Sequence, residues 1–248
     1  MFRVEIDRII ERQMRNWELA RTQTEAPAKP PESRVYEFIA ISRQKGSGGL
    51  DLARRLGDEL GWRVYDHEII DLMAADDALQ HKIYQLADED SEGYLQTLLR
   101  GLDLEPQTPR HDYFRKLVRS IQLMARSAPG IFVGRGAHLI LPRRAGLSVR
   151  VLAPESRRIA EYARTSACSL DEAANAVRRI DEARDRFIRD HFRVNPQAPH
   201  LFDLVLNLEH LSLPAAVRII LAALQDKTGY RREAPARIPE AAVEYSVP

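Results

Sequence analysis

The 248-residue chain carries 37 basic and 36 acidic residues, so its formal net charge is only +1 at pH 7. Such a balance gives no strong field toward nucleic acid or an anionic membrane, and we expect neither as a partner. The single cysteine excludes an intramolecular disulfide and a cysteine metal cluster, which favours a reducing compartment. Because no apolar run approaches the ~18 residues of a membrane span and the N-terminus lacks a signal-peptide core, we expect a cytoplasmic protein.

Residues 1–34 predict a helix followed by a linker. Apolar residues recur at helical spacing among charges between residues 3 and 20, and a proline-rich stretch follows them. We expect this appended helix to dock on the body of the protein, on a second copy of the chain or on a partner.

Residues 35–228 predict one α/β domain with a five-stranded, mostly parallel sheet and helices on both faces. Short apolar segments that read as buried strands lie at 35–42, 62–65, 129–136, 147–153 and 202–207. Helical sequence alternates with them, which is typical of a doubly wound sheet. Residues 67–128 predict a helical insert, residues 155–192 a pair of helices, and residues 229–248 a loose tail rich in proline and charge.

A glycine-rich turn connects the first strand to its helix and contains Gly46, Gly48 and Gly49. Glycine there lets backbone N–H groups approach and bind an anion, and the N-terminus of the following helix adds partial positive charge. A tight strand-to-helix turn also needs glycine for conformation alone, so both interpretations stay open.

This turn departs from the phosphate-loop pattern GxxxxGK[ST]. The register that aligns strand and helix puts Arg43 and Gly48 at the two glycines, Gly49 at the lysine and Leu50 at the Ser/Thr. The usual cation for the terminal phosphates and the usual Mg²⁺-binding hydroxyl are therefore missing.

Neighbouring residues offer replacements for both groups. Arg43 and Lys45 lie in the same turn and could supply positive charge to a phosphate. Ser47 or Asp51 could supply an oxygen ligand to a metal ion.

Arg135 lies directly after a predicted central strand, between Gly134 and Gly136. In open parallel sheets ligands bind at the carboxyl ends of the strands, and an arginine there suits a phosphate or a base. The glycines leave space for a guanidinium that binds bidentately. The alternative is a structural ion pair.

The helix predicted within residues 169–192 carries charges on its inward stripe. The apolar members of that stripe are expected to be Leu170, Ala174, Val177 and Ile188. Asp181 and Arg184 occupy the same stripe, four and seven residues after Val177. Buried charges need a partner or a polar ligand, so this pair is either a structural salt bridge or part of a wet cleft.

Further arginines lie close in sequence to that pair: Arg157, Arg158, Arg178 and Arg179. So many guanidiniums on adjacent helices favour a phosphate-rich ligand, and the alternative is a solvated basic helix pair. Tyr65 and Asp66 follow the second strand, where they either lie over a bound base or cap the next helix.

The order of the SRQKGSGG turn, the YD pair after the second strand, the VGRG turn and the FDLVLN strand resembles the cytidylate kinase-like family. This family is a divergent branch of the P-loop nucleoside monophosphate kinases, and the resemblance covers roughly residues 35 to 226. It implies a P-loop kinase fold, ATP and Mg²⁺ as cofactors, and transfer of the γ-phosphoryl group to a nucleoside monophosphate, with CMP or dCMP favoured.

The resemblance also implies roles for individual residues. Those expected around the ATP phosphates are Arg43, Lys45, Gly46, Ser47, Gly48 and Gly49. Those expected at the acceptor are Tyr65, Asp66, Arg135, Asp181 and Arg184, with the Asp181–Arg184 D-x-x-R element resembling a cytidine-recognising pair. The expected catalytic arginines of the lid-like helices are Arg157, Arg158, Arg178 and Arg184, and residues 67–128 would form the acceptor-binding insert.

Two other functions fit the same sequence. A nucleotide-binding regulatory protein without turnover is favoured by Gly49 at the lysine position and by the added N-terminal helix. A kinase of another small acceptor also fits, because a fold does not fix a substrate.

Overall fold

The computed structural model describes residues 35–75 and 109–231. The predicted helix and linker at 1–34, the middle of the 67–128 insert and nearly all of the 229–248 tail lie outside the described residues.

A five-stranded sheet forms the centre of the protein, as predicted. Its strands are β1 (Phe38–Arg43), β2 (Arg63–Tyr65), β3 (Gly130–Val133), β4 (Gly146–Leu152) and β5 (Leu204–Asn207). Their order is β2-β3-β1-β4-β5, and all four pairings are parallel. The carboxyl ends of β1, β3 and β4 therefore meet at one edge of the sheet.

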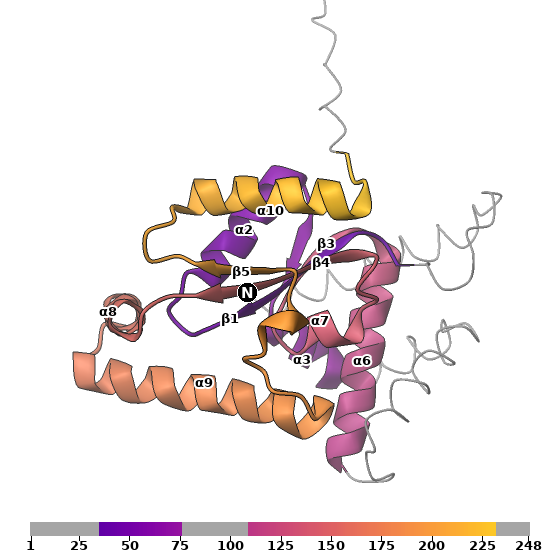
Figure 1. Cartoon of the computed structure of the whole chain (residues 1–248). Coiled ribbons are helices and arrows are strands. Elements are labelled where there is room, and N and C mark those ends of the chain that lie inside the picture. The colour runs from indigo at the N-terminus through magenta and orange to yellow at the C-terminus, as the bar shows by residue number, and fades with distance from the viewer. Residues whose placement is uncertain (1–34, 76–108, 232–248) are drawn as a thin grey trace, which may run out of the picture.

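Helices cover both faces of the sheet (Figure 1). They are α2 (Gly49–Leu60), α3 (His67–Ala75), α6 (Pro109–Ser127), α7 (Ala137–Ile140), α8 (Glu155–Ser166), α9 (Leu170–Phe192) and α10 (Leu213–Thr228), with a 3-10 turn at Pro199–Leu201. Helices α2 and α10 lie on one face, and α3, α6, α7 and α9 lie on the other. No helix within the described ranges is long and apolar enough to cross a membrane.

Strand alternation divides the core into two layers. On β1, Ile39 and Ile41 pack toward α2 and α10, whereas Phe38 and Ala40 pack with α3, α6 and α7. All four side chains are at most 2% exposed. Both layers are apolar, so the polar residues that follow on β1, from Ser42 onward, mark where the core gives way to a site.

Helix α9 begins in a capping box. The Ser169 side chain accepts a hydrogen bond from the Glu172 N–H, and the Glu172 carboxylate accepts one from the Ser169 N–H. The inward stripe differs from the prediction at this end, because Leu170 is 62% exposed and Ala173 is buried in its place. Leu170 is the first residue of α9, and the start of this helix projects beyond α8 in Figure 1.

Candidate phosphate-binding site

A cavity of about 720 Å³ lies between the carboxyl ends of the central strands and α9. Its cationic lining residues are Arg43, Lys45, Arg135, Arg150, Arg158, Arg178, Arg184 and Arg189. Its carboxylates are Glu68, Glu155, Asp181, Glu182 and Asp185. Positive charge is in excess, so the cavity suits an anionic ligand.

The glycine turn is shaped by the side chains and backbone packed on it. Gly46 has a φ of +78°, and a Cβ there would lie 2.4 Å from the carbonyl oxygen of Arg158. A Cβ on Gly49 would lie 2.6 Å from the Cβ of Arg43. Conformation and close packing alone therefore require glycine at these two positions. Lys45 lines the cavity, whereas residues 46–49 are not among its lining residues.

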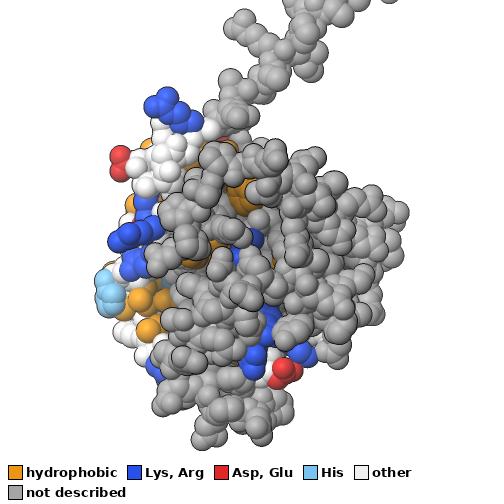
Figure 2. All heavy atoms as spheres, turned by 90° about the vertical axis from the view of Figure 1, so that its right-hand side faces the viewer, with side chains coloured by type: hydrophobic (Ala, Val, Ile, Leu, Met, Phe, Trp, Pro, Cys, Tyr) orange, Lys and Arg blue, Asp and Glu red, His pale blue; other side chains and the backbone are white. Residues whose placement is uncertain are grey.

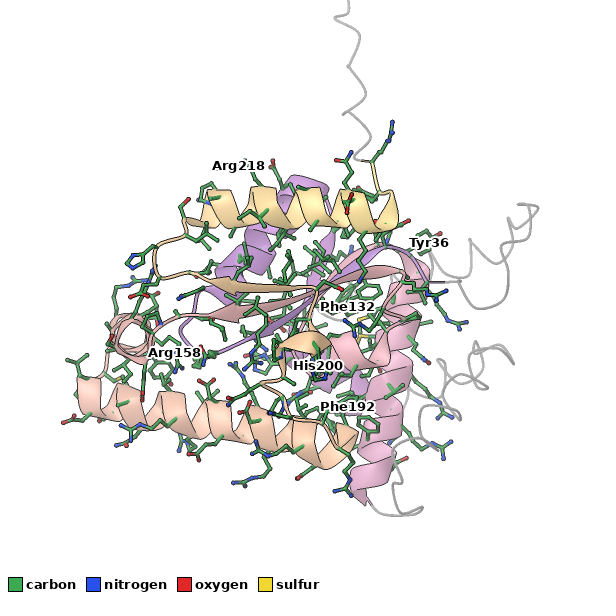
Figure 3. The ribbon with its side chains drawn as sticks, viewed as in Figure 1. Tyr36, Phe132, Arg158, Phe192, His200 and Arg218 are labelled. Atoms are coloured by element: carbon green, nitrogen blue, oxygen red, sulfur yellow. The ribbon has the colours of Figure 1, made fainter. Side chains whose placement is uncertain are left out.

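Asp181 joins α9 to this turn and to α8. Its Oδ1 accepts a hydrogen bond from the Lys45 backbone N–H at 2.8 Å, and its Oδ2 accepts one from Arg158 Nη1 at 2.6 Å. Arg184 Nη1 lies 3.6 Å from Oδ1 and donates to the Arg43 carbonyl at 3.3 Å. Arg158 extends from α8 toward this junction (Figure 3). The predicted salt bridge thus exists, and it borders the cavity.

Arg135 is held by an ion pair on the floor of the cavity. Its Nε donates to Asp71 Oδ1 at 2.6 Å, and its Nη2 donates to Asp71 Oδ2. The Tyr113 hydroxyl donates to the same carboxylate at 2.8 Å, and the guanidinium lies 5.1 Å from the Phe187 ring centroid. The ion-pair alternative is therefore realised, while the guanidinium still lines the cavity.

Arg43 is a cation that makes no ion pair with any described carboxylate. Its Nη2 lies 3.3 Å from His67 Nδ1, which accepts when that imidazole is neutral. A Cβ on Gly134 would lie 2.4 Å from Arg43 Nη1, so that glycine makes room for the guanidinium. Burial, followed by the charge of Arg184, lowers the pKa of Arg43 to about 9. The charged form is still dominant at pH 7, but its charge is poorly compensated.

Lys45, in the glycine-rich turn, is also a desolvated cation close to other cations. Burial, and then the charges of Arg184 and Arg43, lower the pKa of Lys45. Its ammonium nitrogen lies 5.1 Å from the centroid of the Tyr162 ring. Arg43 at the end of β1, Lys45 in the turn after it, and Arg184 from α9 thus crowd one end of the cavity.

Arg150 was not predicted as a site residue, yet it lines the cavity from β4 and is only 9% exposed. Its Nη1 donates to Ser42 Oγ at 3.1 Å, and its guanidinium lies 5.5 Å from the Phe202 ring centroid. Burial lowers its pKa. A lone arginine inside the apolar strand segment GLSVRVL was the available signal.

Several predicted residues lie elsewhere. Tyr65 packs in the core, 1% exposed, with its ring stacked 5.1 Å from Phe132, so it does not reach the cavity. Asp66 caps α3 by accepting the Glu68 and Ile69 N–H groups at 3.1 Å. Of the two alternatives for this pair, capping is the one that the structure shows.

Arg157 and the two candidate metal ligands also lie outside the cavity lining. Arg157 donates to the carbonyls of Leu208 and Glu209, which ties α8 to the segment after β5. The exposed Asp51 pairs with Arg54, and the buried Ser47 hydroxyl donates to the Gln44 carbonyl at 2.8 Å. Arg178 does line the cavity and lies 3.4 Å from Glu155.

The residues present fit phosphate groups better than a protein-built metal cage. Within the described ranges, no group of three or more His, Cys, Asp and Glu side chains could hold a metal ion. Mg²⁺ in phosphoryl-transfer sites needs only one or two carboxylates because phosphate oxygens and water complete its shell. The cavity carboxylates allow that mode, and the identity of the metal ligand stays a prediction.

Positive charge is not confined to the cavity. Lys and Arg side chains of described residues also reach the surface on the α6 side of the molecule (Figure 2). Exposed arginines elsewhere on the surface can serve as control positions when a cavity cation is substituted. Arg54 on α2, whose side chain is 64% exposed, is one of them.

Comparisons with known proteins find one matching family model and several similar solved structures. A family model described as the cytidylate kinase-like family matches residues 38–210, well over half of the chain. An uncharacterized protein from Eubacterium ventriosum has a similar structure, with a TM-score of 0.61, 18% identity, and coverage of 77% of this chain and 98% of that one. A shikimate kinase from Bacteroides thetaiotaomicron matches with a TM-score of 0.41 and 12% identity, over 75% of this chain and 97% of that one. The search of curated proteins finds no match.

Proposed function

Because the chain belongs to the cytidylate kinase-like family, we propose that it transfers the γ-phosphoryl group of ATP to a nucleoside monophosphate, with CMP or dCMP favoured. The observation that carries this proposal is the cluster of Arg43, Lys45 and Arg184 at the carboxyl end of β1. Arg43 has no carboxylate partner among the described residues, and its pKa is lowered to about 9.

Crowded, desolvated cations raise the free energy of the empty site. Burial removes more hydration from each of these cations than nearby carboxylates compensate for, Asp181 beside Arg184 included, which is why the pKa values of Arg43, Lys45 and Arg184 are lowered. A phosphate that enters among them supplies the missing negative charge and removes this cost. In phosphoryl transfer, where charge spreads over the equatorial oxygens, the same cations would act on the transition state.

The proposed roles follow from position. Arg43, Lys45 and Arg184 would neutralise the transferred phosphoryl group, and Arg135 would hold the acceptor phosphate with Asp71 fixing its guanidinium. A carboxylate of the cavity lining would hold the Mg²⁺ that accompanies ATP, and the ion would supply further neutralisation of the phosphate charge. Residues of both α8 and α9 line the cavity, and this helix pair would exclude water during transfer.

One observation favours a second candidate, a nucleotide-binding regulatory protein without turnover. The Asp181 carboxylate already occupies the Lys45 backbone N–H, which a phosphate would otherwise use, and Gly49 stands where the loop lysine would be. Such a protein would bind nucleotides in the same cavity but transfer nothing.

Replacing Arg43 with methionine is expected to weaken the binding of CMP and of ATP–Mg²⁺ at least about tenfold, since a hydrogen bond to a charged group contributes about 1.5–3 kcal/mol. Methionine retains most of the apolar stem, so the fold is expected to persist. Isothermal titration calorimetry measures the affinities.

The control is Arg54→Met on α2, which removes an exposed arginine that contacts Asp51. This variant is expected to bind both nucleotides like the unchanged protein. Unchanged affinity in Arg43→Met, or an equal loss in both variants, would remove the proposed phosphate site.

A further inference from the structure

The carboxylate expected to recognise a cytosine amino group is already engaged. One oxygen of Asp181 accepts the Lys45 N–H and the other accepts Arg158 Nη1, at 2.8 and 2.6 Å. An amino group could reach this carboxylate only by displacing a backbone N–H or a buried guanidinium. Base recognition therefore calls for another carboxylate in the cavity.

Asp185 is a cavity carboxylate that can still accept a hydrogen bond from a ligand. It lies four residues further along α9, lines the cavity and is half-buried. Its Oδ2 accepts a hydrogen bond from Gln197 Nε2 at 3.1 Å, which fixes the carboxylate. Its Oδ1 has no hydrogen-bond partner within the described part of the chain, so that oxygen can accept from a ligand.

Arg150 supplies donors from the sheet side of the same cavity. Within the described residues its one side-chain hydrogen bond runs from Nη1 to Ser42 Oγ, and its guanidinium lies 5.5 Å from the centroid of the Phe202 ring. Burial lowers the pKa of Arg150 and the charge of Asp185 partly opposes this, yet the two side chains form no ion pair. Both side chains line the same cavity.

We propose that Arg150 and Asp185 recognise the base of the acceptor, an assignment that rests on the proposed function. Cytosine offers two adjacent acceptors, N3 and O2, beside the N4 amino donor. The planar fork of Arg150 matches the acceptors, and Asp185 matches the donor. A second phosphate fits this part of the cavity less well because it would face the Asp185 carboxylate.

Arg150 and Asp185 would also discriminate between cytosine and uracil. Uracil carries a carbonyl where cytosine carries the amino group, so its oxygen would face the carboxylate of Asp185 without a proton between them. Leaving such a polar pair unmatched costs more than losing a contact. CMP is therefore expected to bind more tightly than UMP.

Calorimetric titration with CMP, UMP and ribose 5-phosphate tests the assignment, because ribose 5-phosphate keeps the sugar and phosphate but lacks the base. Asp185→Asn is expected to weaken CMP binding at least about tenfold. It should also narrow the difference in affinity between CMP and UMP, since an asparagine amide can donate to the uracil carbonyl. Arg150→Met is expected to weaken CMP similarly. Both variants should bind ribose 5-phosphate within about twofold of the unchanged protein.

Asp58→Asn is the matched control, because Asp58 is an exposed carboxylate on α2 that is not among the residues lining the cavity. It should leave CMP affinity and the CMP-to-UMP affinity ratio unchanged. Equal losses of CMP and ribose 5-phosphate affinity in Asp185→Asn would show a merely structural role and overturn the assignment, as would a loss of CMP affinity in Asp58→Asn.

The unchanged protein separates the two proposals. Equal affinity for CMP and ribose 5-phosphate would overturn base recognition while leaving the phosphate site intact. Absence of binding by both ligands would overturn the proposed function itself and the base assignment with it.

Discussion

Replacing Gly46 with alanine is expected to destabilise the protein by about 3 kcal/mol and to abolish nucleotide binding. The φ of +78° is strained for any residue with a Cβ, which costs roughly 1–2 kcal/mol. The added Cβ would also lie 2.4 Å from the Arg158 carbonyl oxygen, a backbone atom that cannot turn aside as a side chain would. Either the turn or the start of α8 must move, and both carry residues of the cavity. Urea denaturation measures the stability loss.

Gly61→Ala separates strain from packing. Gly61 ends α2 with a φ of +67°, similar to that of Gly46, but nothing lies within 4 Å of the position of a Cβ there. We expect this variant to lose only about 1–2 kcal/mol and to retain nucleotide binding. Equal losses in the two variants would contradict the contact between the turn and α8.

Replacing Asp181 with alanine is expected to cost about 3 kcal/mol of stability. The Arg158 side chain is 9% exposed, and Asp181 is the carboxylate that lies 2.6 Å from it. Removing one partner of a buried pair leaves an uncompensated charge, which typically costs about 3–5 kcal/mol. Because Asp181 is itself 22% exposed, we place the expected loss at the low end of that range.

A double-mutant cycle with Arg158→Met tests the reason for that loss. If the pair is the cause, the double variant should be more stable than the sum of the two single losses predicts, with a coupling of about 1–3 kcal/mol. Chemical denaturation of the four proteins gives the coupling. Strictly additive losses would show that Asp181 contributes through its other contact, with the Lys45 N–H.

The sheet was predictable because its signals are local. Short β-branched segments such as FIAIS and GIFV alternate with helical sequence, and Gly61 follows Leu60 at the point where α2 ends. That all the strand pairings are parallel follows from the same alternation. Leu170 was wrongly predicted to be buried because sequence periodicity does not show where a helix extends past the helix it packs against.

The site was predictable only in part. Periodicity placed Asp181 and Arg184 on the inward stripe of α9, and both do line the cavity. The ion pair between Arg135 and Asp71 joins residues 64 positions apart, so only the tertiary fold reveals it. Arg150 lies in a strand whose other residues predict full burial, and its charge was not assigned a function from the sequence.

Turnover tests the central claim most directly. The purified protein is incubated with ATP, Mg²⁺ and each nucleoside monophosphate in turn, with release of ADP followed by a coupled assay and Arg184→Ala as the comparison. The kinase function predicts saturable ADP release that is fastest with CMP or dCMP and is lost in Arg184→Ala. Nucleotide binding without ADP release with any acceptor would contradict it and establish the regulatory function in its place.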